Sequence, residues 1–349
     1  MCKSCDTLST PIRAAVSRIW FVPTPKQERI NPKKVSAAAA KSRSRKPGGR
    51  PPGVAPAPKA TVSDWIGGAR LRTLPLAIAP VALGTATAYI LGDGEWHLVR
   101  ALLCLAVALG LQIGVNFAND YSDGIRGTDA HRVGPARLTG SGAASPRAVL
   151  TVALVFFALA ALAGIALIVL SGIYWLLAVG AACVVAAWFY TGGTRPYGYA
   201  GLGELFVFVF FGLVATAGTT LVQAGTVSVE SWVAGVAAGL FACAVLVANN
   251  LRDLDQDKAA GKKTLSVRIG GTSSRILFGV LVLTPFALLV FFSILFINAP
   301  YTYLTLFIAI PAVVIVSTAK SAKEFVLALQ LASLTALAYA LVLSAAIVF

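Results

Sequence analysis

The stretch Asn116-Phe-Ala-Asn119-Asp120-Tyr-Ser-Asp123 stands at the end of a long apolar segment. If the helix of that segment continues, its two asparagines and two aspartates fall at i, i+3, i+4 and i+7. Residues at this spacing project from one face of a helix. Carboxylates are costly at the edge of a bilayer, so we interpret this face as a deliberate cluster of hard oxygen ligands.

A second cluster of the same kind follows 133 residues later, counted from Asp120 to Asp253. Its members lie at i, i+1, i+4 and i+8, again at the end of an apolar run: Asn249, Asn250, Asp253 and Asp257. Carboxylate oxygens are the ligands that Mg²⁺ prefers. We therefore expect the two faces to hold a divalent cation between them.

The composition indicates a membrane protein. Of 349 residues, 57% are hydrophobic and only 12% are charged, with a mean hydropathy of +0.80. A helix needs about 20 apolar residues to cross a bilayer, and nine runs approach that length. The sequence therefore predicts an all-α integral membrane protein with nine transmembrane helices, at about 74–92, 98–118, 148–170, 173–190, 202–224, 231–250, 275–297, 301–318 and 325–349.

The distribution of basic residues supports this count. Lys and Arg are enriched in cytoplasmic loops, and 16 of them lie beyond residue 60. Threading nine spans from a cytoplasmic N-terminus leaves only Arg100 outside. Removing or adding a span would reverse every later loop. We therefore expect a multi-pass protein of the cell membrane with both acidic clusters, and hence the active site, on the cytoplasmic side.

Residues 1–60 form a separate basic segment, followed by a membrane domain over 61–349. The segment holds 13 Lys or Arg against Asp6 and Glu28, and it is rich in Pro, Ser, Ala and Gly. Such a composition predicts disorder. It is compatible with a solvated tail near anionic lipid or with a transit peptide. A later, non-standard start codon is the third alternative, because Met1 is the sole methionine.

The acidic clusters are interleaved with arginines and lysines, which suggests a phosphate-bearing ligand. Plain ion pairing at a membrane surface is one interpretation. The alternative that explains two matched Asn/Asp faces is a diphosphate held by Mg²⁺ and by cationic side chains. A lipid diphosphate would place its headgroup at the rim and its chain among the helices. Nearby rings could then stabilise an allylic cation: Phe117, Tyr121, Phe189 and Tyr190.

Four blocks of the sequence resemble the UbiA superfamily of intramembrane prenyltransferases, and within it the 1,4-dihydroxy-2-naphthoate branch of menaquinone biosynthesis. These blocks are Asn119-Asp-Tyr-x-Asp-Gly-x-Arg-Gly-Thr-Asp129, Arg132-Val-Gly-Pro-x-Arg-Leu138, the segment Tyr190 to Glu204, and the segment Asn249 to Leu265. The resemblance covers roughly residues 63–349. Two departures are Leu71, where a proline is common, and Asp129, two residues beyond the usual third acid position at Gly127.

The resemblance implies nine helices around a central cavity with cytoplasmic cap loops. It implies transfer of an all-trans polyprenyl group from its diphosphate to 1,4-dihydroxy-2-naphthoate, with loss of CO₂. The expected catalytic and Mg²⁺-binding residues are Asp120, Asp123, Asp253 and Asp257. The expected substrate-binding residues are Asn116, Asn119, Arg126, Arg132, Arg137, Tyr190, Arg195, Glu204, Asn249, Asn250, Arg252, Lys258 and Lys262.

The expected partners are the polyprenyl diphosphate, the naphthoate and the lipid bilayer, with no nucleic acid. Two alternatives stay open at this point. Another branch of the superfamily would prenylate 4-hydroxybenzoate or homogentisate, although the Tyr190 to Glu204 block argues against it. A transporter of an anionic substrate would need polar groups near the midplane and comparable gates on both sides. The predicted outside loops are too short for such a gate.

Overall fold

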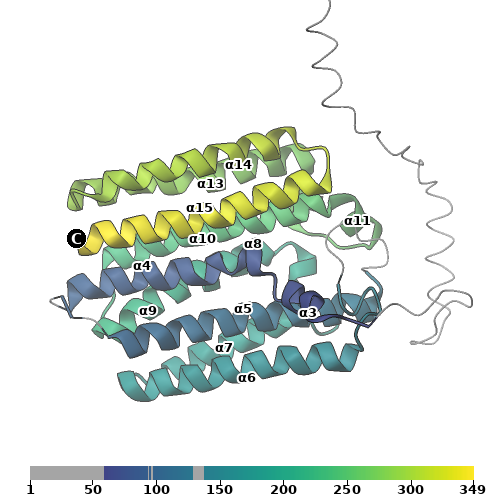
Figure 1. Ribbon diagram of the computed structural model, residues 1–349, viewed down its shortest axis with the longest axis horizontal. Helices are drawn as coiled ribbons and strands as arrows, with labels where there is room; N and C mark the ends of the chain where they lie inside the picture. Colours follow the sequence, from purple (N-terminus) through teal and green to yellow (C-terminus); the bar gives the residue numbers. More distant parts are fainter. Residues whose placement is uncertain (1–58, 93, 96, 129–136) are drawn as a thin grey trace, which may run out of the picture. The chain divides into compact units, whose positions relative to one another are not determined.

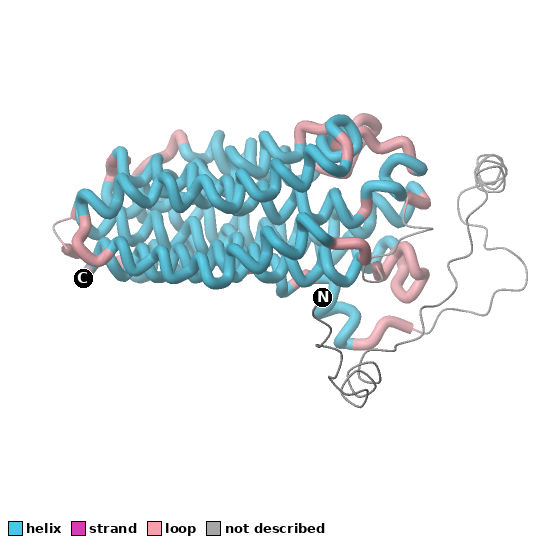
Figure 2. The backbone as a smooth tube through the Cα atoms, turned by 90° about the horizontal axis from the view of Figure 1, so that it is seen from above, coloured by secondary structure: helices cyan, strands magenta, loops and turns pink. Residues whose placement is uncertain are grey.

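A computed structural model of the chain describes residues 59–92, 94–95, 97–128 and 137–349. These residues belong to one compact unit, Ala57–Phe349, and within the described ranges every regular element is helical. Figure 2 shows the long helices running side by side, with loops gathered at the two ends of the bundle. The predicted N-terminal tail, together with Asp129 and Arg132, lies outside the described residues.

The described chain begins with a short helix that is sharply bent against the next one. Helix α3 (Val62–Gly68) starts at Thr61, whose hydroxyl accepts from the backbone N–H of Asp64 while the Asp64 carboxylate caps Thr61 in return. This reciprocal pair is a capping box. The 3₁₀ turn η1 (Leu71–Thr73) then leads into α4 (Pro75–Leu91) across a bend of 46°. A short capped helix therefore precedes the first long one.

The remaining elements follow the predicted apolar runs. Two of the long helices carry the acidic clusters at their ends, α5 (Leu98–Arg126) and α10 (Val229–Arg252). The others are α6 (Pro146–Ser171), α7 (Leu176–Phe189), η2 (Tyr197–Ala200), α8 (Gly203–Val207), η3 (Phe208–Val214), α9 (Ala215–Ala224), α11 (Leu254–Ala259), α12 (Leu265–Ile269), α13 (Gly271–Leu295), η4 (Ala299–Thr305), α14 (Leu306–Thr318) and α15 (Ala322–Val348).

Seven helices among the described residues are long and apolar enough to cross a membrane, and the bent α3–α4 pair makes up to eight. Helix α7 is apolar but has only 14 residues, which corresponds to about 21 Å at 1.5 Å per residue. The chain is therefore a multi-pass membrane protein. The fourth predicted span, 173–190, coincides with α7, whose length falls short of the roughly 30 Å of hydrocarbon, so the count of nine spans is not confirmed.

Helix α10 lies at the centre of the main core, packed against α13, α15, α4 and η3. Figure 1 shows α13 and α14 on one side of α10 and α15, with α4, α9, α5, α7 and α6 on the other. The core is filled by large rings and branched chains that are almost fully buried, among them Phe241, Phe278, Phe292, Tyr339 and Leu343. Burial of this kind of apolar surface rigidifies the helix that carries the second acidic cluster.

A π-helical segment, η3, interrupts the span between α8 and α9 and packs closely on α10. A Cβ atom added at Gly212 would lie 2.6 Å from the carbonyl oxygen of Gly235 and 2.6 Å from the Cα of Gly239. The Gly235-xxx-Gly239 pattern of α10 thus marks close packing of two helices.

Candidate functional site

A large cavity of about 800 Å³ extends from the acidic clusters into the interior of the bundle. Its wall on α5 is one continuous face, with lining residues spaced by three or four positions, as a helix face requires. They are Cys104, Val107, Ala108, Leu111, Gln112, Val115, Asn116, Asn119, Asp120 and Asp123. From Asp123 to Cys104 this face rises 19 residues, or about 28 Å. The cavity therefore has the depth of a bilayer core.

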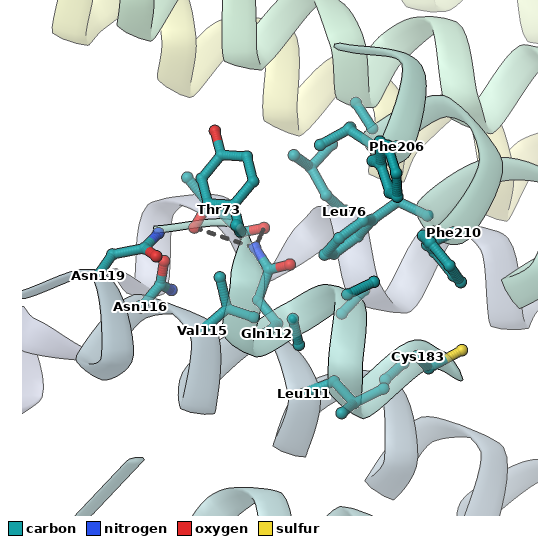
Figure 3. A pocket seen from close by; sticks show the side chains of 18 of the residues that line it. Thr73, Leu76, Leu111, Gln112, Val115, Asn116, Asn119, Cys183, Phe206 and Phe210 are labelled. Carbon is teal, nitrogen blue, oxygen red and sulfur yellow. Dashed lines mark hydrogen bonds between the residues drawn. The ribbon is translucent and has the colours of Figure 1, made fainter. Parts of the chain in front are cut away.

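The two ends of this cavity differ chemically. The loop end carries carboxylates, amides, arginines and a lysine, whereas the deeper wall consists mostly of apolar residues from α4, α6, α7, α9 and η3. Figure 3 shows Asn116 and Asn119 at one side of the pocket, away from Phe206 and Phe210. The cavity therefore fits a ligand with a charged head and a long hydrocarbon tail.

Asp120 fastens a loop to the end of α5. Its two carboxylate oxygens each accept a backbone N–H, from Leu138 and from Thr139, both at 2.9 Å. The side chain is only 3% exposed. Hydrogen bonds from backbone N–H groups to an ionised carboxylate are among the stronger ones in proteins. Asp120 thus orders the segment that carries Arg137, and it also lines the cavity.

Asp123 is the point where positive groups converge. Its Oδ2 lies 2.5 Å from Nη1 of Arg137, and its Oδ1 lies 3.3 Å from Nζ of Lys262. The Tyr199 hydroxyl also donates to it. Burial and the neighbouring Asp123 charge raise the pKa of Tyr199, so this hydroxyl keeps its proton and remains a donor. Asp123 is 2% exposed, and its charge is matched by these partners.

The second acidic cluster meets the first through Lys262. Its ammonium lies 3.3 Å from Oδ1 of Asp123 and 3.8 Å from Oδ1 of Asp257, so one cation bridges both clusters. Asp253 pairs with its neighbour Arg252, at 2.8 Å to Nε and 2.6 Å to Nη2. This contact within one helix end leaves Asp253 on the cavity wall. The two clusters therefore face each other, as the sequence predicts.

The donor set fits a magnesium ion that is shared with a ligand. Among the residues that the structure places, no three His, Cys, Asp or Glu side chains are gathered closely enough to bind one metal by themselves. Mg²⁺ is usually bound through one or two carboxylates, with water and phosphate oxygens completing its shell. The four aspartates line the cavity in two pairs that face each other. This arrangement matches an ion held jointly by protein and diphosphate rather than a closed protein cage.

Two amides of α5 hold the bent entry segment against the cavity. Nε2 of Gln112 donates to the carbonyl of Thr73 at 3.0 Å (Figure 3), and Nδ2 of Asn116 donates to that of Ala69 at 3.0 Å. Between these anchors, Arg70 adopts a left-handed backbone conformation with φ 55°. Such a conformation is unfavourable for a residue with a Cβ and is often found at functional sites. It places Arg70 on the cavity wall.

The segment after α7 is held by residues from the ends of α5 and α10. Arg126 donates to the carbonyls of Thr191 and Gly193. The Thr191 hydroxyl in turn donates to Oδ1 of Asn119 at 2.6 Å. A second anchor joins Nδ2 of Asn250 to Oε1 of the buried Glu204 at 2.9 Å. Arg126 and Glu204 therefore hold segments that form the cavity wall without lining the cavity themselves.

Most of the predicted site residues line the cavity: Asn116, Asn119, Asp120, Asp123, Arg137, Tyr190, Asn249, Asn250, Arg252, Asp253, Asp257 and Lys262. Four others occupy described positions outside the cavity wall, namely Arg126, Arg195, Glu204 and Lys258. Arg195 and Lys258 are exposed to solvent. The structure therefore gives no support to the prediction that Arg195 and Lys258 bind substrate.

The sequence interpretation missed several lining residues, including Arg70, Arg72, Gln112, Tyr197 and Tyr199. Tyr199 lies in the quoted block from Tyr190 to Glu204, and Arg70 and Arg72 directly precede the first predicted span. Their places in the sequence could therefore have marked them as candidate site residues.

The predicted set of cavity rings is corrected by the structure. Phe117 packs instead with Trp65 and Phe156 in a separate core cluster. Of the four proposed rings, Tyr190 is the one on the described cavity wall. It stands at the start of an aromatic series that continues through Tyr197, Phe206 and Phe210, with ring centroids 5.5, 4.0 and 6.1 Å apart.

Solved structures of low sequence identity share this fold. The apo structure of a UbiA homolog from Aeropyrum pernix K1 superposes with a TM-score of 0.59 at 18% identity, covering 76% of this chain and 94% of that one. A UbiA homolog from Archaeoglobus fulgidus bound to GPP and Mg²⁺ gives 0.55 at 15% identity, covering 81% and 99%. At these identities the likeness concerns the fold.

Sequence relatives are much closer. The 1,4-dihydroxy-2-naphthoate octaprenyltransferase of Mycobacterium tuberculosis is 57% identical over 219 residues, covering 63% of this chain and 74% of that protein. The enzyme of the same name from Escherichia coli is 36% identical over 251 residues, covering 70% and 81%. The UbiA prenyltransferase family model matches residues 77–334. This chain belongs to the UbiA prenyltransferase family.

Proposed function

We propose that this protein transfers a polyprenyl group from its diphosphate to 1,4-dihydroxy-2-naphthoate, in menaquinone biosynthesis. The observation that carries the proposal is the cavity with a charged end and an apolar body about 28 Å deep. Relatives named 1,4-dihydroxy-2-naphthoate octaprenyltransferase at up to 57% identity support the choice of acceptor. Their names also favour this branch over the 4-hydroxybenzoate or homogentisate alternatives.

The polar end binds the diphosphate. Arg137 and Lys262 are held at the cavity by Asp123, so their positive charges lie where a diphosphate would bind. Asp120, Asp123, Asp253 and Asp257 would hold Mg²⁺, with Asn116 and Asn249 beside them. When bound, the ion would neutralise the negative charge that builds up on the departing diphosphate. A homologue bound to GPP and Mg²⁺ supports this assignment.

In the reaction the prenyl group replaces the carboxylate on one carbon of the acceptor ring. The bond between the first prenyl carbon and the diphosphate oxygen breaks, and the electron pair leaves with the diphosphate. The ring carbon that bears the carboxylate forms the new carbon–carbon bond, and that carboxylate departs as CO₂. The rings of Tyr190, Tyr197 and Phe206 present electron-rich surfaces that would stabilise positive charge on the allylic carbon.

Arg70 is our proposed contact for the acceptor carboxylate. It lies on the cavity wall, and its backbone is fixed by hydrogen bonds that Gln112 and Asn116 make to the same segment. A guanidinium matches the geometry of a carboxylate. The positive charge of Arg70 acts on Tyr190, which lines the same cavity. The acceptor would therefore lie between the entry segment and the aromatic series.

The proposal extends to the arrangement in the membrane. We propose nine spans, with the α3–α4 pair as the first and α7 as the fourth, and with the acidic clusters and their cap loops on the cytoplasmic side. The basic residues support it, because this threading leaves Arg100 as the single Lys or Arg outside beyond residue 60. The basic segment 1–60 would be a tail separate from the membrane domain.

The test is turnover by the purified full chain in detergent. The protein is incubated with 1,4-dihydroxy-2-naphthoate and a polyprenyl diphosphate, with Mg²⁺ or with EDTA, and products are followed by mass. A prenylated, decarboxylated quinol that forms only with the metal is the expected result. Prenylation of 4-hydroxybenzoate instead would contradict the acceptor assignment, and no product with any acceptor would reopen the transporter alternative.

A further inference from the structure

The deep part of the cavity contains structure that diphosphate binding does not require. On α6 and α9 the wall continues to Leu167 and Val222, which form an apolar floor with Cys104 and Val81. This floor lies about 28 Å from Asp123 along α5. The inference below rests on the proposed function and asks what sets the length of the chain that fits here.

The π-helical segment keeps one wall of the cavity in line with its full depth. Lining residues on this span recur every four positions: Phe206, Phe210, Val214, Gly218 and Val222. In an uninterrupted α-helix, 16 residues at 100° each would leave the last one about 160° away from the first. A π turn takes one extra residue per turn, which removes about 100° of that rotation. The π-helix η3 therefore keeps both ends of the series facing the cavity.

The glycines of the membrane helices differ in what an added Cβ would meet. At Gly84, Gly110 and Gly212 an added Cβ would meet backbone atoms of another helix, at 2.4, 3.2 and 2.6 Å. At Gly218 an added Cβ would meet nothing within 4 Å, and at Gly164 only the Val107 side chain, at 3.8 Å. Both of the latter line the cavity, on α9 and α6.

The cavity glycines are not explained by helix packing. Glycine in a helix interior is less stable than alanine because it loses more backbone freedom on folding. At Gly218 and Gly164 there is room for a side chain, so close approach of backbones does not require glycine there. What a side chain would remove is cavity volume, and at Gly164 the depth is that of Val107, about 24 Å from Asp123 along α5.

We infer that Gly218 and Gly164 are specificity-determining residues that keep the deep cavity open for the distal part of a long prenyl chain. A short donor ends above them and is indifferent to their side chains. A long donor has to pass them before it reaches the floor of Cys104, Leu167 and Val222. Chain-length selection therefore depends on the two glycines, whereas chemistry depends on the aspartates.

The experiment compares a short and a long donor in the same protein. Wild type, Gly218→Leu and Gly164→Leu are assayed with 1,4-dihydroxy-2-naphthoate and Mg²⁺, using geranyl diphosphate and octaprenyl diphosphate. We expect kcat/KM for the octaprenyl donor to fall about ten-fold or more in both variants, with little change for the geranyl donor. The geranyl reaction is also the check that each variant folds and retains its catalytic end.

Gly218→Ala and Gly279→Ala form the matched control pair. Gly279 lies on α13, where an added Cβ meets Val313 at an ordinary 3.5 Å. The Gly279 variant should treat both donors as wild type does, and the Gly218 variant should show a smaller loss limited to the long donor. Equal loss with both donors, or unchanged octaprenyl turnover in the leucine variants, would overturn the inference. Inactivity of the wild type with both donors would instead refute the proposed function.

Discussion

The two acidic clusters look alike in sequence but are built differently. In the first, Asp120 and Asp123 are 3% and 2% exposed and are fixed by groups far along the chain, from residues 137–139, 199 and 262. In the second, Asp253 and Asp257 are each 8% exposed, and among their contacts are Arg252, next to Asp253, and Lys262, five residues after Asp257. The first cluster therefore assembles the site, and the second is the more accessible one.

This difference separates two tasks that the sequence assigns to all four aspartates alike. A carboxylate with several distant partners organises loops, and its loss affects both stability and chemistry. A carboxylate paired with its own neighbour can exchange partners at less structural expense. The comparison predicts larger combined effects for the first cluster and mainly metal-dependent effects for the second.

The largest expected effect is that of Asp123→Asn. Removing this charge leaves Arg137 and Lys262 without the carboxylate that orients them, and we expect kcat to fall by about 10³-fold. The measurement is turnover at saturating donor and Mg²⁺. Asp255→Asn is the matched control, because Asp255 is an exposed acid of the second cluster region. Near-normal kcat for Asp123→Asn would remove the basis of the comparison.

Asp253→Asn should lower turnover by a smaller factor, about 10²-fold, and should move the Mg²⁺ dependence to higher concentrations. The reason is that Asp253 lies on the cavity wall beside Arg252, with 8% of its surface exposed, where it would be a metal ligand. A magnesium titration at fixed donor concentration measures both quantities. An unchanged magnesium midpoint with reduced kcat would argue that Asp253 serves orientation instead.

Asp120→Ala tests stability. Two backbone N–H groups, of Leu138 and Thr139, would lose their acceptor. An orphaned buried donor costs about 1–3 kcal/mol, so the unfolding midpoint should fall clearly below that of wild type in the same detergent. Asp253→Ala serves as the comparison and should shift the midpoint less. A reversed order of the two midpoints would contradict the assembling role of the first cluster.

The smallest expected effect is a change of stability with pH near Tyr199. Burial and the Asp123 charge raise the pKa of Tyr199 above its ordinary value of 10.0. Above about pH 10 the unfolded chain therefore releases this proton first, and stability falls as the pH rises. In Tyr199→Phe the decline of the unfolding midpoint above that pH should be shallower. An identical decline in both proteins would show that Asp123 and Tyr199 do not interact as described.

The sequence was sufficient to predict the helices and the pairing of the two clusters. Apolar runs fixed the spans closely, because hydrophobic length is a local property. The i, i+3, i+4, i+7 spacing predicted a common face, and Asn116, Asn119, Asp120 and Asp123 all lie on the cavity wall. Opposition of Asp123 and Asp257 across Lys262 followed from the same reasoning.

Other features depend on contacts between distant segments and could not be predicted from local patterns. Phe117 and Tyr190 both seemed suited to face the cavity, yet helix rotation turns Phe117 into a core with Trp65. The left-handed conformation of Arg70 depends on a segment held by Gln112 and Asn116 from another helix. The π-helix η3 likewise follows from its packing on α10.

Arg100, on the far side of the bundle, connects the fold to its own biogenesis. Its guanidinium donates to the carbonyl of Leu170 at the end of α6 and to those of Val222 and Gln223 at the end of α9. Helix C-termini carry partial negative charge, so these ends neutralise the cation locally. Since α9 is synthesised long after α5, the arginine acquires its full set of acceptors only late in insertion. The polar clamp therefore ties the start of α5 to the ends of α6 and α9, and it is complete only once α9 has been made.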